Sequence, residues 1–546
     1  MRIIYKTLFL VIALSFFSCS QEVEKPRLVI VISFDHLAYN TYSHYLPIFS
    51  GGFKWLHDHG VTFNNAHHEH GYTSTGPGHF VLGSGLYPGP VGVLGNNWYD
   101  PVKDKDVYCV DDANAKALDI PSSSVSYGQV NGTTYGDWLK AVSPASKVYA
   151  VATKDRAAIM MGGKNPDLVI WYNWNGAFTT TDYYTKTIPA WLHKFNTQAN
   201  MISYRDSVWT KSLPEARYAE YTHGDFFNGE TDRYLDTPYS PVFPIGFEPQ
   251  WGDAKVLSEL GNRPWMDRQL LDLAKVLIDE EQLGQDATPD ILSIGLSTMD
   301  LVAHYYGPYS HEVMDHLIKT DQYLLTFLNY LDDEIGLENI LFALSSDHGG
   351  LPLPEHRTQI EGKPGGRVNE DDYWAARESA YAALDSIYGT HRFIHRKGSS
   401  YFYSQAIMDS MQVVSTVVDS ILQVHMESVA GIQRLYSKAE LLDPDPSDRS
   451  AVRLGHFMHS ELSPDLYTLE TEGWLFRNPY GTSHGTPYEY DSHVPIIFSA
   501  LAFNTLVLTD SVSTTDLAPT LGDILGVSPL NKVDGISLKS RLYDLR

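Results

Sequence analysis

The sequence predicts an α/β protein with a doubly wound, mostly parallel sheet and helices on both faces. Short, continuous apolar runs recur along the chain, as is typical of buried parallel strands. Segments with helical periodicity lie between several of these runs, and such alternation indicates strand–helix–strand units. Ligands of such sheets bind beyond the carboxyl ends of the strands. The residues that follow each run are therefore the candidates for a functional site.

Five apolar runs are the predicted strands. They are residues 28–33, 148–152, 291–296, 340–344 and 494–498. Helices are predicted at Trp265–Leu283 and His311–Leu331, where apolar residues recur every three or four positions.

Two stretches are predicted to be insertions that cap a single catalytic domain of residues 21–546. Residues 165–250 are rich in Trp, Tyr, Asn and Pro and show little periodicity. Residues 351–480 contain a strand-like segment, Ser399–Tyr403, followed by a helical pattern from Ile407 to Val424.

The charge of the chain limits its partners. Among 546 residues, 66 are acidic and 40 are basic, which gives a formal net charge of -26. A nucleic acid partner requires a basic surface, so we expect none. A small anionic substrate is still compatible, because a few local cations and metal ions can override the global field.

Residues 1–20 are predicted to be an export signal. Arg2 and Lys6 precede an apolar stretch at residues 7–17, which is shorter than the roughly 20 residues of a membrane span. Two endings are open: cleavage near Ser20, or a bacterial lipoprotein in which Cys19 carries the lipid anchor. The second is favoured, because the only other cysteine is Cys109. The protein is thus expected in the periplasm or anchored to the envelope, without an internal disulfide.

A set of Asp and His residues follows the predicted strands or lies in glycine-flanked loops. The set is Asp35, Asp300, His304, Asp347, His348 and His484. Asp300 and His304 are four residues apart, so a helix would place both on one face. One such pair is more often a cap or a surface pair. The whole mixed set predicts a zinc centre, because imidazole and carboxylate are zinc ligands.

Thr75 opens the segment Thr-Gly-Pro-Gly-His79, which reads as a tight turn leading into a helix. The N-terminus of a helix favours an anion. The alternative is a plain N-cap, but a neighbouring metal would make the Thr75 hydroxyl a nucleophile. His67, His68 and His70 precede this turn. An exposed or packed turn is the preferred interpretation, and residues that support the metal ligands, or a metal site, are the alternatives.

These motifs, in this order, resemble the alkaline phosphatase superfamily. The resemblance also includes Asn96–Asp100, and it spans most of the chain. The nearest branches are the nucleotide pyrophosphatase/phosphodiesterases and the PafA-type alkaline phosphatases. The resemblance implies an alkaline-phosphatase-like fold and two zinc ions. Asp300, His304 and His484 would hold the first zinc, and Asp35, Asp347, His348 and Thr75 the second.

Lys154 and Arg156, after the strand at 148–152, resemble the Lys-x-Arg pair of PafA-type monoesterases. A monoester phosphoryl group spreads nearly two negative charges over three oxygens, which two cations would neutralise. Residues two apart on an extended segment point the same way, so both are expected to face the site. The resemblance favours Asn96 as a third phosphoryl ligand, with Asn97 as the alternative.

The resemblance implies hydrolysis of small-molecule phosphate monoesters through a covalent phospho-threonine at Thr75. A phosphodiesterase or nucleotide pyrophosphatase on the same scaffold is the first alternative. A sulfatase is disfavoured, because no C/S-x-P-x-R motif lies at the expected position. A lipoprotein that binds sugars through its aromatic insertions, with a degenerate metal site, is the alternative of another class. The natural substrate and the oligomeric state are open.

Overall fold

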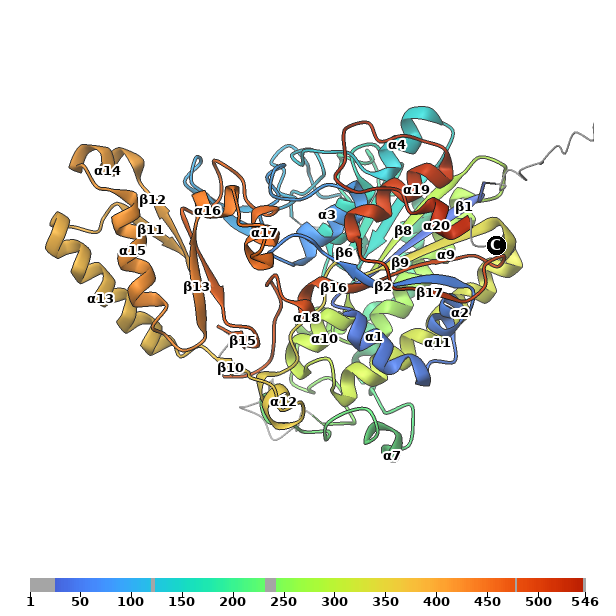
Figure 1. Ribbon diagram of the computed structural model, residues 1–546. Helices are drawn as coiled ribbons and strands as arrows, with labels where there is room; N and C mark the ends of the chain where they lie inside the picture. The colour runs from blue at the N-terminus through green and yellow to red at the C-terminus, as the bar shows by residue number, and fades with distance from the viewer. Residues whose placement is uncertain (1–24, 119–122, 231–241, 477–478, 544–546) are drawn as a thin grey trace, which may run out of the picture.

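The computed structural model describes residues 25–118, 123–230, 242–476 and 479–543, so the predicted export signal and Cys19 lie outside the described residues. Within these ranges, we find no helix with the length and apolar character that a membrane span requires. The molecule consists of a large body and a smaller inserted unit beside it (Figure 1).

The body is built on a central sheet of ten strands within the described part of the chain, in the order β17-β2-β16-β9-β1-β8-β5-β6-β7, with β18 also paired to β2. All five predicted runs are strands of this sheet: β1 (Leu28–Phe34), β5 (Val148–Ala152), β8 (Asp290–Leu296), β9 (Ile340–Ser345) and β16 (His493–Ser499). The other members are β2 (Gly60–His67), β6 (Leu168–Tyr172), β7 (Phe178–Thr179), β17 (Leu506–Leu508) and β18 (Val512–Ser513). β9, β1, β8, β5 and β6 pair in parallel, whereas β16 is antiparallel to both β9 and β2.

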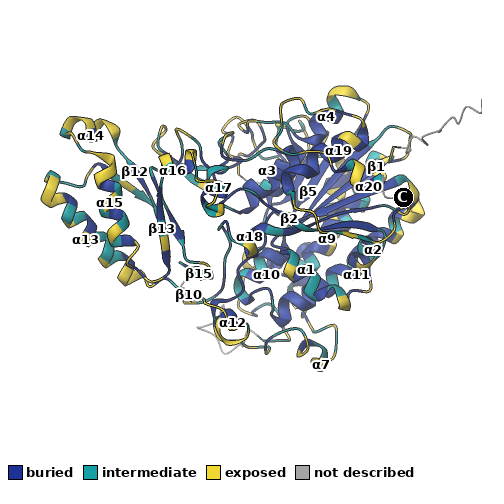
Figure 2. Cartoon of the chain, viewed as in Figure 1, coloured by how far each residue is buried: buried dark blue, intermediate teal, exposed yellow. Residues whose placement is uncertain are grey.

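Strand β1 shows why the sheet is covered on both faces. Leu28, Ile30 and Ile32 belong to one apolar core, and Val29 and Val31 belong to the core on the opposite face. Successive side chains of a strand point to opposite faces, so an uninterrupted apolar run requires helices on both sides. The strands accordingly form the buried interior of the body (Figure 2).

The helices form two layers. One layer packs against the face of Ile30 and contains α1 (Tyr39–Tyr45), α2 (Gly52–Asp58), α9 (Trp265–Glu281), α10 (Thr298–Tyr306) and α11 (His311–Glu334). The other layer contains α3 (Thr75–Ser84), α4 (Tyr135–Val142), α5 (Asp155–Gly162) and α19 (Leu517–Leu525). The two helices predicted from periodicity are therefore present as α9 and α11.

The stretch at 165–250 begins inside the central sheet, because it contains β6 and β7. Beyond them, the described residues of this stretch form short helices, α6 (Ala190–Ala199) and α7 (Glu215–Tyr218), with the 3₁₀ segment Met201–Asp206. Trp191, Tyr204 and Trp209 bury their rings in the same core as α9. The aromatic composition of this stretch therefore serves packing against the body.

The stretch at 351–480 contains the inserted unit, which we define as residues 370–470. Its antiparallel sheet has the order β11-β12-β14-β13, formed by β11 (Ile394–Lys397), β12 (Ser400–Tyr403), β14 (Leu466–Glu470) and β13 (Ile432–Ser437). Helices α13 (Glu370–Tyr388), α14 (Gln405–Met411) and α15 (Ser415–Met426) lie on the side away from the body (Figure 1). The helical pattern from Ile407 to Val424 is interrupted, because Gln412 has a φ of 55° and β-branched Val413 and Val414 follow it.

Candidate active site

The chain brings its candidate residues to one edge of the central sheet. Asp35 follows β1, Lys154 follows β5, Asp300 lies just beyond β8, and Asp347 and His348 follow β9. These four strands are neighbours and run in parallel, so their carboxyl ends meet. The site therefore lies where the strand pattern predicts it.

Two further segments reach this edge by other routes. Strand β16 runs antiparallel to β9, so the loop that precedes it, with His484, lies at the same edge. The Asp491 carboxylate fixes this loop by accepting hydrogen bonds from the backbone N–H groups of Gly485 and Thr486, at 3.0 and 2.8 Å. Thr75 is the first residue of α3, which follows β2.

Asp300 is the centre of the first ligand group. Its Oδ1 lies 3.3 Å from His304 Nε2 and 3.6 Å from His484 Nε2. His36 lies nearer to this oxygen than either of them, with its Nδ1 2.8 Å away. The four residues each offer a ligand atom within 4.8 Å of the others. The three residues that the resemblance assigns to the first zinc are thus together, and His36 joins them.

Asp35, Asp347 and His348 form the second group. His348 Nε2 lies 3.4 Å from Asp35 Oδ1 and 3.3 Å from Asp347 Oδ2. Asp300 also lies within ligand distance of Asp35 and His348, so the two groups adjoin. Every member of the second group is buried.

The protonation of the histidines suits metal binding. His304, His348 and His484 each place Nδ1 against a backbone carbonyl oxygen, at 2.8–2.9 Å, so Nδ1 carries the proton and Nε2 keeps its lone pair. Burial, together with neighbouring histidines, lowers the pKa of His484 to about 3 and that of His348 well below its usual range. All the Nε2 lone pairs face carboxylates.

Asp35 and Asp347 each keep one carboxylate oxygen without a hydrogen-bond partner. Burial and the neighbouring Asp35 carboxylate raise the pKa of Asp347 well above its usual range. Asp35 Oδ1, Asp347 Oδ2 and His348 Nε2 are buried without a hydrogen-bond partner. Buried acceptors that face one another are costly unless a cation lies between them. This donor set, imidazole and carboxylate, fits divalent zinc.

Lys154 provides one positive charge inside the site. Its Nζ donates to Asp35 Oδ2 at 2.7 Å and to Asp300 Oδ2 at 2.5 Å. Burial acts against its charge, but these two carboxylates outweigh it and raise the pKa of Lys154. The expected extended segment ends at Lys154, which is the N-cap of α5, because Arg156 lies in the first turn of that helix. Both side chains nevertheless face the site.

Arg156 reaches the candidate nucleophile. Its Nη2 lies 3.4 Å from Thr75 Oγ1, and its Nη1 lies 3.5 Å from the Tyr108 hydroxyl. That hydroxyl donates to Asp155 Oδ1 at 2.5 Å. Tyr108 and Asp155 raise the pKa of the Arg156 guanidinium against the effect of burial, so it stays charged. Tyr108 and Asp155 thus hold the guanidinium beside Thr75.

Thr75 is not a helix cap. Ser74 is the N-cap of α3, and neither side chain caps the helix. The packing around Thr75 explains the nearby glycine. A Cβ on Gly78 would lie 2.0 Å from the carbonyl oxygen of Asp347, so only glycine lets α3 approach the ligand loop.

The N–H of Gly76 donates to Asn96 Oδ1 at 2.7 Å, which leaves the amide Nδ2 of Asn96 as a donor. Asn97 is exposed and begins the strand β3 (Asn97–Asp100).

A comparison with known families identifies the chain. The family model of type I phosphodiesterases and nucleotide pyrophosphatases matches residues 29–493. The chain belongs to this family. It is therefore a phosphoesterase, and its site lies on the part of the fold that the family model covers.

Several similar proteins are named bacterial alkaline phosphatases. Alkaline phosphatase PafA of Elizabethkingia meningoseptica is 29% identical over 517 residues, which cover 93% of each chain. Alkaline phosphatase PhoV of Synechococcus elongatus is 29% identical over 521 residues, covering 93% of this chain and 91% of the relative. The crystal structure of wild-type PafA superimposes with a TM-score of 0.86 at 26% identity, covering 95% of this chain and 99% of that one. A PafA variant changed at one Thr, one Asn, one Lys and one Arg gives 0.85 at 25% identity, with the same coverage.

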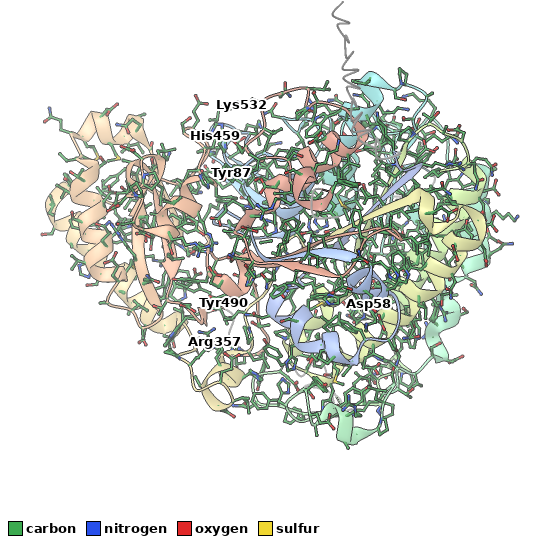
Figure 3. The ribbon with its side chains drawn as sticks, turned by 45° about the vertical axis from the view of Figure 1, so that its right-hand side comes forward. Asp58, Tyr87, Arg357, His459, Tyr490 and Lys532 are labelled. Atoms are coloured by element: carbon green, nitrogen blue, oxygen red, sulfur yellow. The ribbon has the colours of Figure 1, made fainter. Side chains whose placement is uncertain are left out.

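A cavity of about 490 Å³ opens beside the site of this phosphoesterase. Residues of the body and of the inserted unit line it together, among them Trp98, Phe402, Phe457 and His484. Tyr490, in its wall, lies under the Arg357 guanidinium at 5.5 Å, at the junction of the inserted unit and the body (Figure 3). The cavity is thus an aromatic-walled space that reaches a metal-ligand candidate.

Sequence reasoning missed His36. Its backbone has a φ of 72°, and its backbone N–H donates to Asp347 Oδ1 at 3.2 Å. A Cβ on Gly350 would lie 1.7 Å from His36 Nε2, so the glycine pair after His348 makes room for this ring. The signal was its position directly after Asp35, at the end of the first strand. His79 also lies close, with Nδ1 3.3 Å from Asp347 Oδ2 and 2.8 Å from the carbonyl oxygen of Thr75.

Proposed function

We propose that this phosphoesterase is a zinc-dependent alkaline phosphatase that hydrolyses small-molecule phosphate monoesters through a covalent phospho-threonine at Thr75. One observation carries the choice of monoesters. Two cations, the buried Lys154 and the partly buried Arg156, lie against the metal-ligand candidates and the Thr75 hydroxyl. A dianionic phosphoryl group requires this much positive charge, and a diester has one negative charge less.

We assign two zinc ions to the two ligand groups. Asp300, His304 and His484 would hold the first. Asp35, Asp347 and His348, with the Thr75 oxygen, would hold the second. When bound, zinc supplies Lewis acidity that lowers the pKa of a coordinated hydroxyl and stabilises negative charge on oxygen.

Side chains of this protein carry out the transfer of the phosphoryl group. Thr75 Oγ attacks phosphorus in line, the ester oxygen leaves with the alcohol, and the phosphoryl group becomes bonded to Thr75. Water then displaces Thr75 from phosphorus, which releases phosphate and restores the hydroxyl. Asn96, Lys154 and Arg156 bind the three non-bridging oxygens, and the planar guanidinium of Arg156 can bind two of them.

The relatives support this assignment. PafA and PhoV are named alkaline phosphatases. The substitutions in the PafA variant fall on one residue of each type that we assign to the nucleophile and the phosphoryl ligands. In this chain, the contact of Asn96 with Gly76 favours Asn96 over the exposed Asn97.

The aromatic-walled cavity is the proposed place for the leaving group. Trp98, Phe402 and Phe457 can cover a flat apolar group, and Lys397 in the same wall can meet an additional negative charge. We also propose that the protein is exported, on the strength of Arg2, Lys6 and the apolar stretch at residues 7–17. The lipid anchor at Cys19 is part of that proposal.

The deciding experiment compares kcat/KM for an aryl phosphate monoester and the matching diester on one zinc-loaded preparation. A strong preference for the monoester that disappears after chelation and returns with zinc is the expected result. A preference for the diester would leave the assignment of the metals and of Thr75 unchanged. It would contradict the proposal that Lys154 and Arg156 bind the phosphoryl group. It would make a phosphodiesterase, the alternative on this scaffold, the better assignment.

A further inference from the structure

A second set of metal-ligand side chains lies outside the active site, where β2 and β16 pair. His67, the last residue of β2, is directly opposite His493, the first residue of β16. Their rings stack at a centroid distance of 4.6 Å, and Tyr39 stacks on the other side of His493 at 5.0 Å. Glu489 begins the short helix α18 (Glu489–Ser492), which leads into β16.

Neighbouring groups fix the tautomers of both histidines. His493 Nε2 lies 2.8 Å from the carbonyl oxygen of Asn64, which can only accept, so Nε2 carries the proton. His67 Nε2 lies 2.8 Å from Asn65 Oδ1. The orientation of that amide follows from its Nδ2, which donates to the carbonyl oxygen of Thr509 at 3.3 Å. Both rings therefore keep their lone pair on Nδ1.

The lone pair of His67 Nδ1 faces a carboxylate. His67 Nδ1 lies 3.5 Å from Glu489 Oε2. The His67 side chain is buried, with 5% of its surface exposed, and Nδ1 has no hydrogen-bond partner. Two acceptors thus face each other without a hydrogen between them, an arrangement that a cation would relieve.

Two arginines orient the Glu489 carboxylate toward the histidines. Arg449 Nη1 lies 2.9 Å and Arg453 Nη1 lies 3.5 Å from Glu489 Oε1. The two guanidiniums therefore hold one oxygen and leave Oε2 to the histidines. Glu69 lies 3.1 Å from Arg453 and 3.5 Å from Arg449, and its negative charge offsets theirs. The Glu489 side chain is 52% exposed, so solvent can reach the site.

We propose that His67, His493 and Glu489 bind a zinc ion that is separate from the active-site metals. One ligand atom from each residue lies within 4.8 Å of the others. The 3.5 Å between His67 Nδ1 and Glu489 Oε2 matches the separation of about 3.4 Å between two ligands of tetrahedral zinc. Two imidazoles and one carboxylate leave a fourth position for water.

This zinc would have a structural role. It joins α18 to the end of β2, and α18 also contains Asp491, whose carboxylate fixes the loop of His484. The ion would therefore hold the segment that carries an active-site ligand without contacting substrate. Substitutions at this site should reduce thermal stability and leave kcat/KM unchanged.

The test is the zinc content of the full chain. Wild type, His67→Asn, His493→Gln and Glu489→Gln are stripped with a chelator and dialysed to equilibrium against micromolar zinc, and bound zinc per chain is measured by plasma mass spectrometry. We expect each variant to bind one zinc fewer than wild type, with unchanged kcat/KM for an aryl phosphate. His391→Asn is the control, because His391 forms a comparable pair with Asp385 at 2.8 Å on the inserted unit.

Equal zinc content in wild type and Glu489→Gln would overturn the proposal. Glu489 is half exposed, so this variant is expected to fold even if the histidine variants do not. The rise in melting temperature on adding zinc to stripped protein should also be smaller in Glu489→Gln than in wild type. The difference of one zinc does not depend on the active-site metals, so this test and the test of the proposed function can fail separately.

Discussion

At the scale of single residues, the site combines opposite charges that are nearly all buried. Asp35, Asp300 and Asp347 lie together, with one lysine between two of them. Such a cluster stabilises the fold only while its charges are compensated. Because uncompensated carboxylates destabilise the fold, this cluster should bind cations strongly. Those cations in turn favour a phosphoryl group beside them.

Thr75→Ala should lower kcat for an aryl phosphate monoester by at least about 10³-fold, because the attacking oxygen is removed. Thr75→Ser keeps that oxygen and should retain measurable turnover. Zinc content should stay close to that of wild type in both variants, since the other ligand candidates remain. Full activity of Thr75→Ala would show that the nucleophile is another group.

Lys154→Ala and Arg156→Ala should each lower kcat/KM for the monoester by roughly 10²–10³-fold, and change kcat/KM for the diester much less. Steady-state kinetics on both substrates measures this difference. Because Lys154 also contacts Asp35 and Asp300, zinc content is measured in parallel. Equal losses on both substrates at full zinc content would contradict the monoester assignment.

The sequence was most informative where strand ends carried Asp or His, and least where the backbone is unusual. The neighbours of β1 could be predicted as strands, so Asp35, Asp300 and Asp347 could be placed at one edge. His36 could not, because its role depends on a positive φ and on the space left by Gly350. Lys154 and Arg156 both face the site, as expected. The reason is not an extended backbone, because helix α5 begins between them.

At the scale of elements, the helix α3 and the inserted unit define the two sides of the site. Helix α3 approaches the Asp347 loop so closely that Gly78 cannot carry a side chain. The inserted unit supplies part of the cavity wall. One strand of its sheet, β12, matches the strand-like segment predicted at Ser399–Tyr403. The sequence pattern did not predict β11, β13 and β14, because they are short strands from distant parts of the insertion.

Trp98→Ala should raise KM for an aryl phosphate by about 3- to 10-fold, corresponding to the 0.5–1.5 kcal/mol typical of an aromatic contact. KM for a small alkyl phosphate, which lacks a group to fill the cavity, should change little. Steady-state kinetics on the two esters checks this. A matched control is Trp374→Ala, since Trp374 stacks with Arg377 at 4.1 Å outside this cavity. An equal rise on both esters would place the leaving group elsewhere.

At the scale of the whole molecule, the inserted unit and the body are joined across the cavity. Glu470, the last residue of β14, lies in this wall. Burial raises the pKa of Glu470 to about 7 from an ordinary value of 4.5. A carboxyl group in such a place binds its proton more tightly in the folded chain than in the unfolded chain.

The folded chain therefore loses stability from this group as pH rises from about 4.5 to about 7. Glu470→Gln should remove that loss. Its urea midpoint should exceed that of wild type by an amount that grows between pH 5 and about 7.5 and then levels off. Glu461→Gln, at an exposed position, serves as the control. A midpoint difference that does not vary with pH would contradict the assignment.

The order of the strands also determines when the molecule can fold. Within the described residues, β2 pairs only with β16, β17 and β18, all of which begin at residue 493 or later. During synthesis, β2 therefore remains unpaired until almost all of these residues have been made. Contacts this distant in sequence make folding slow and leave strand edges open to aggregation. We expect the nascent chain to depend on a holding chaperone, and the ligand of the last loop, His484, to join the site only after synthesis is nearly complete.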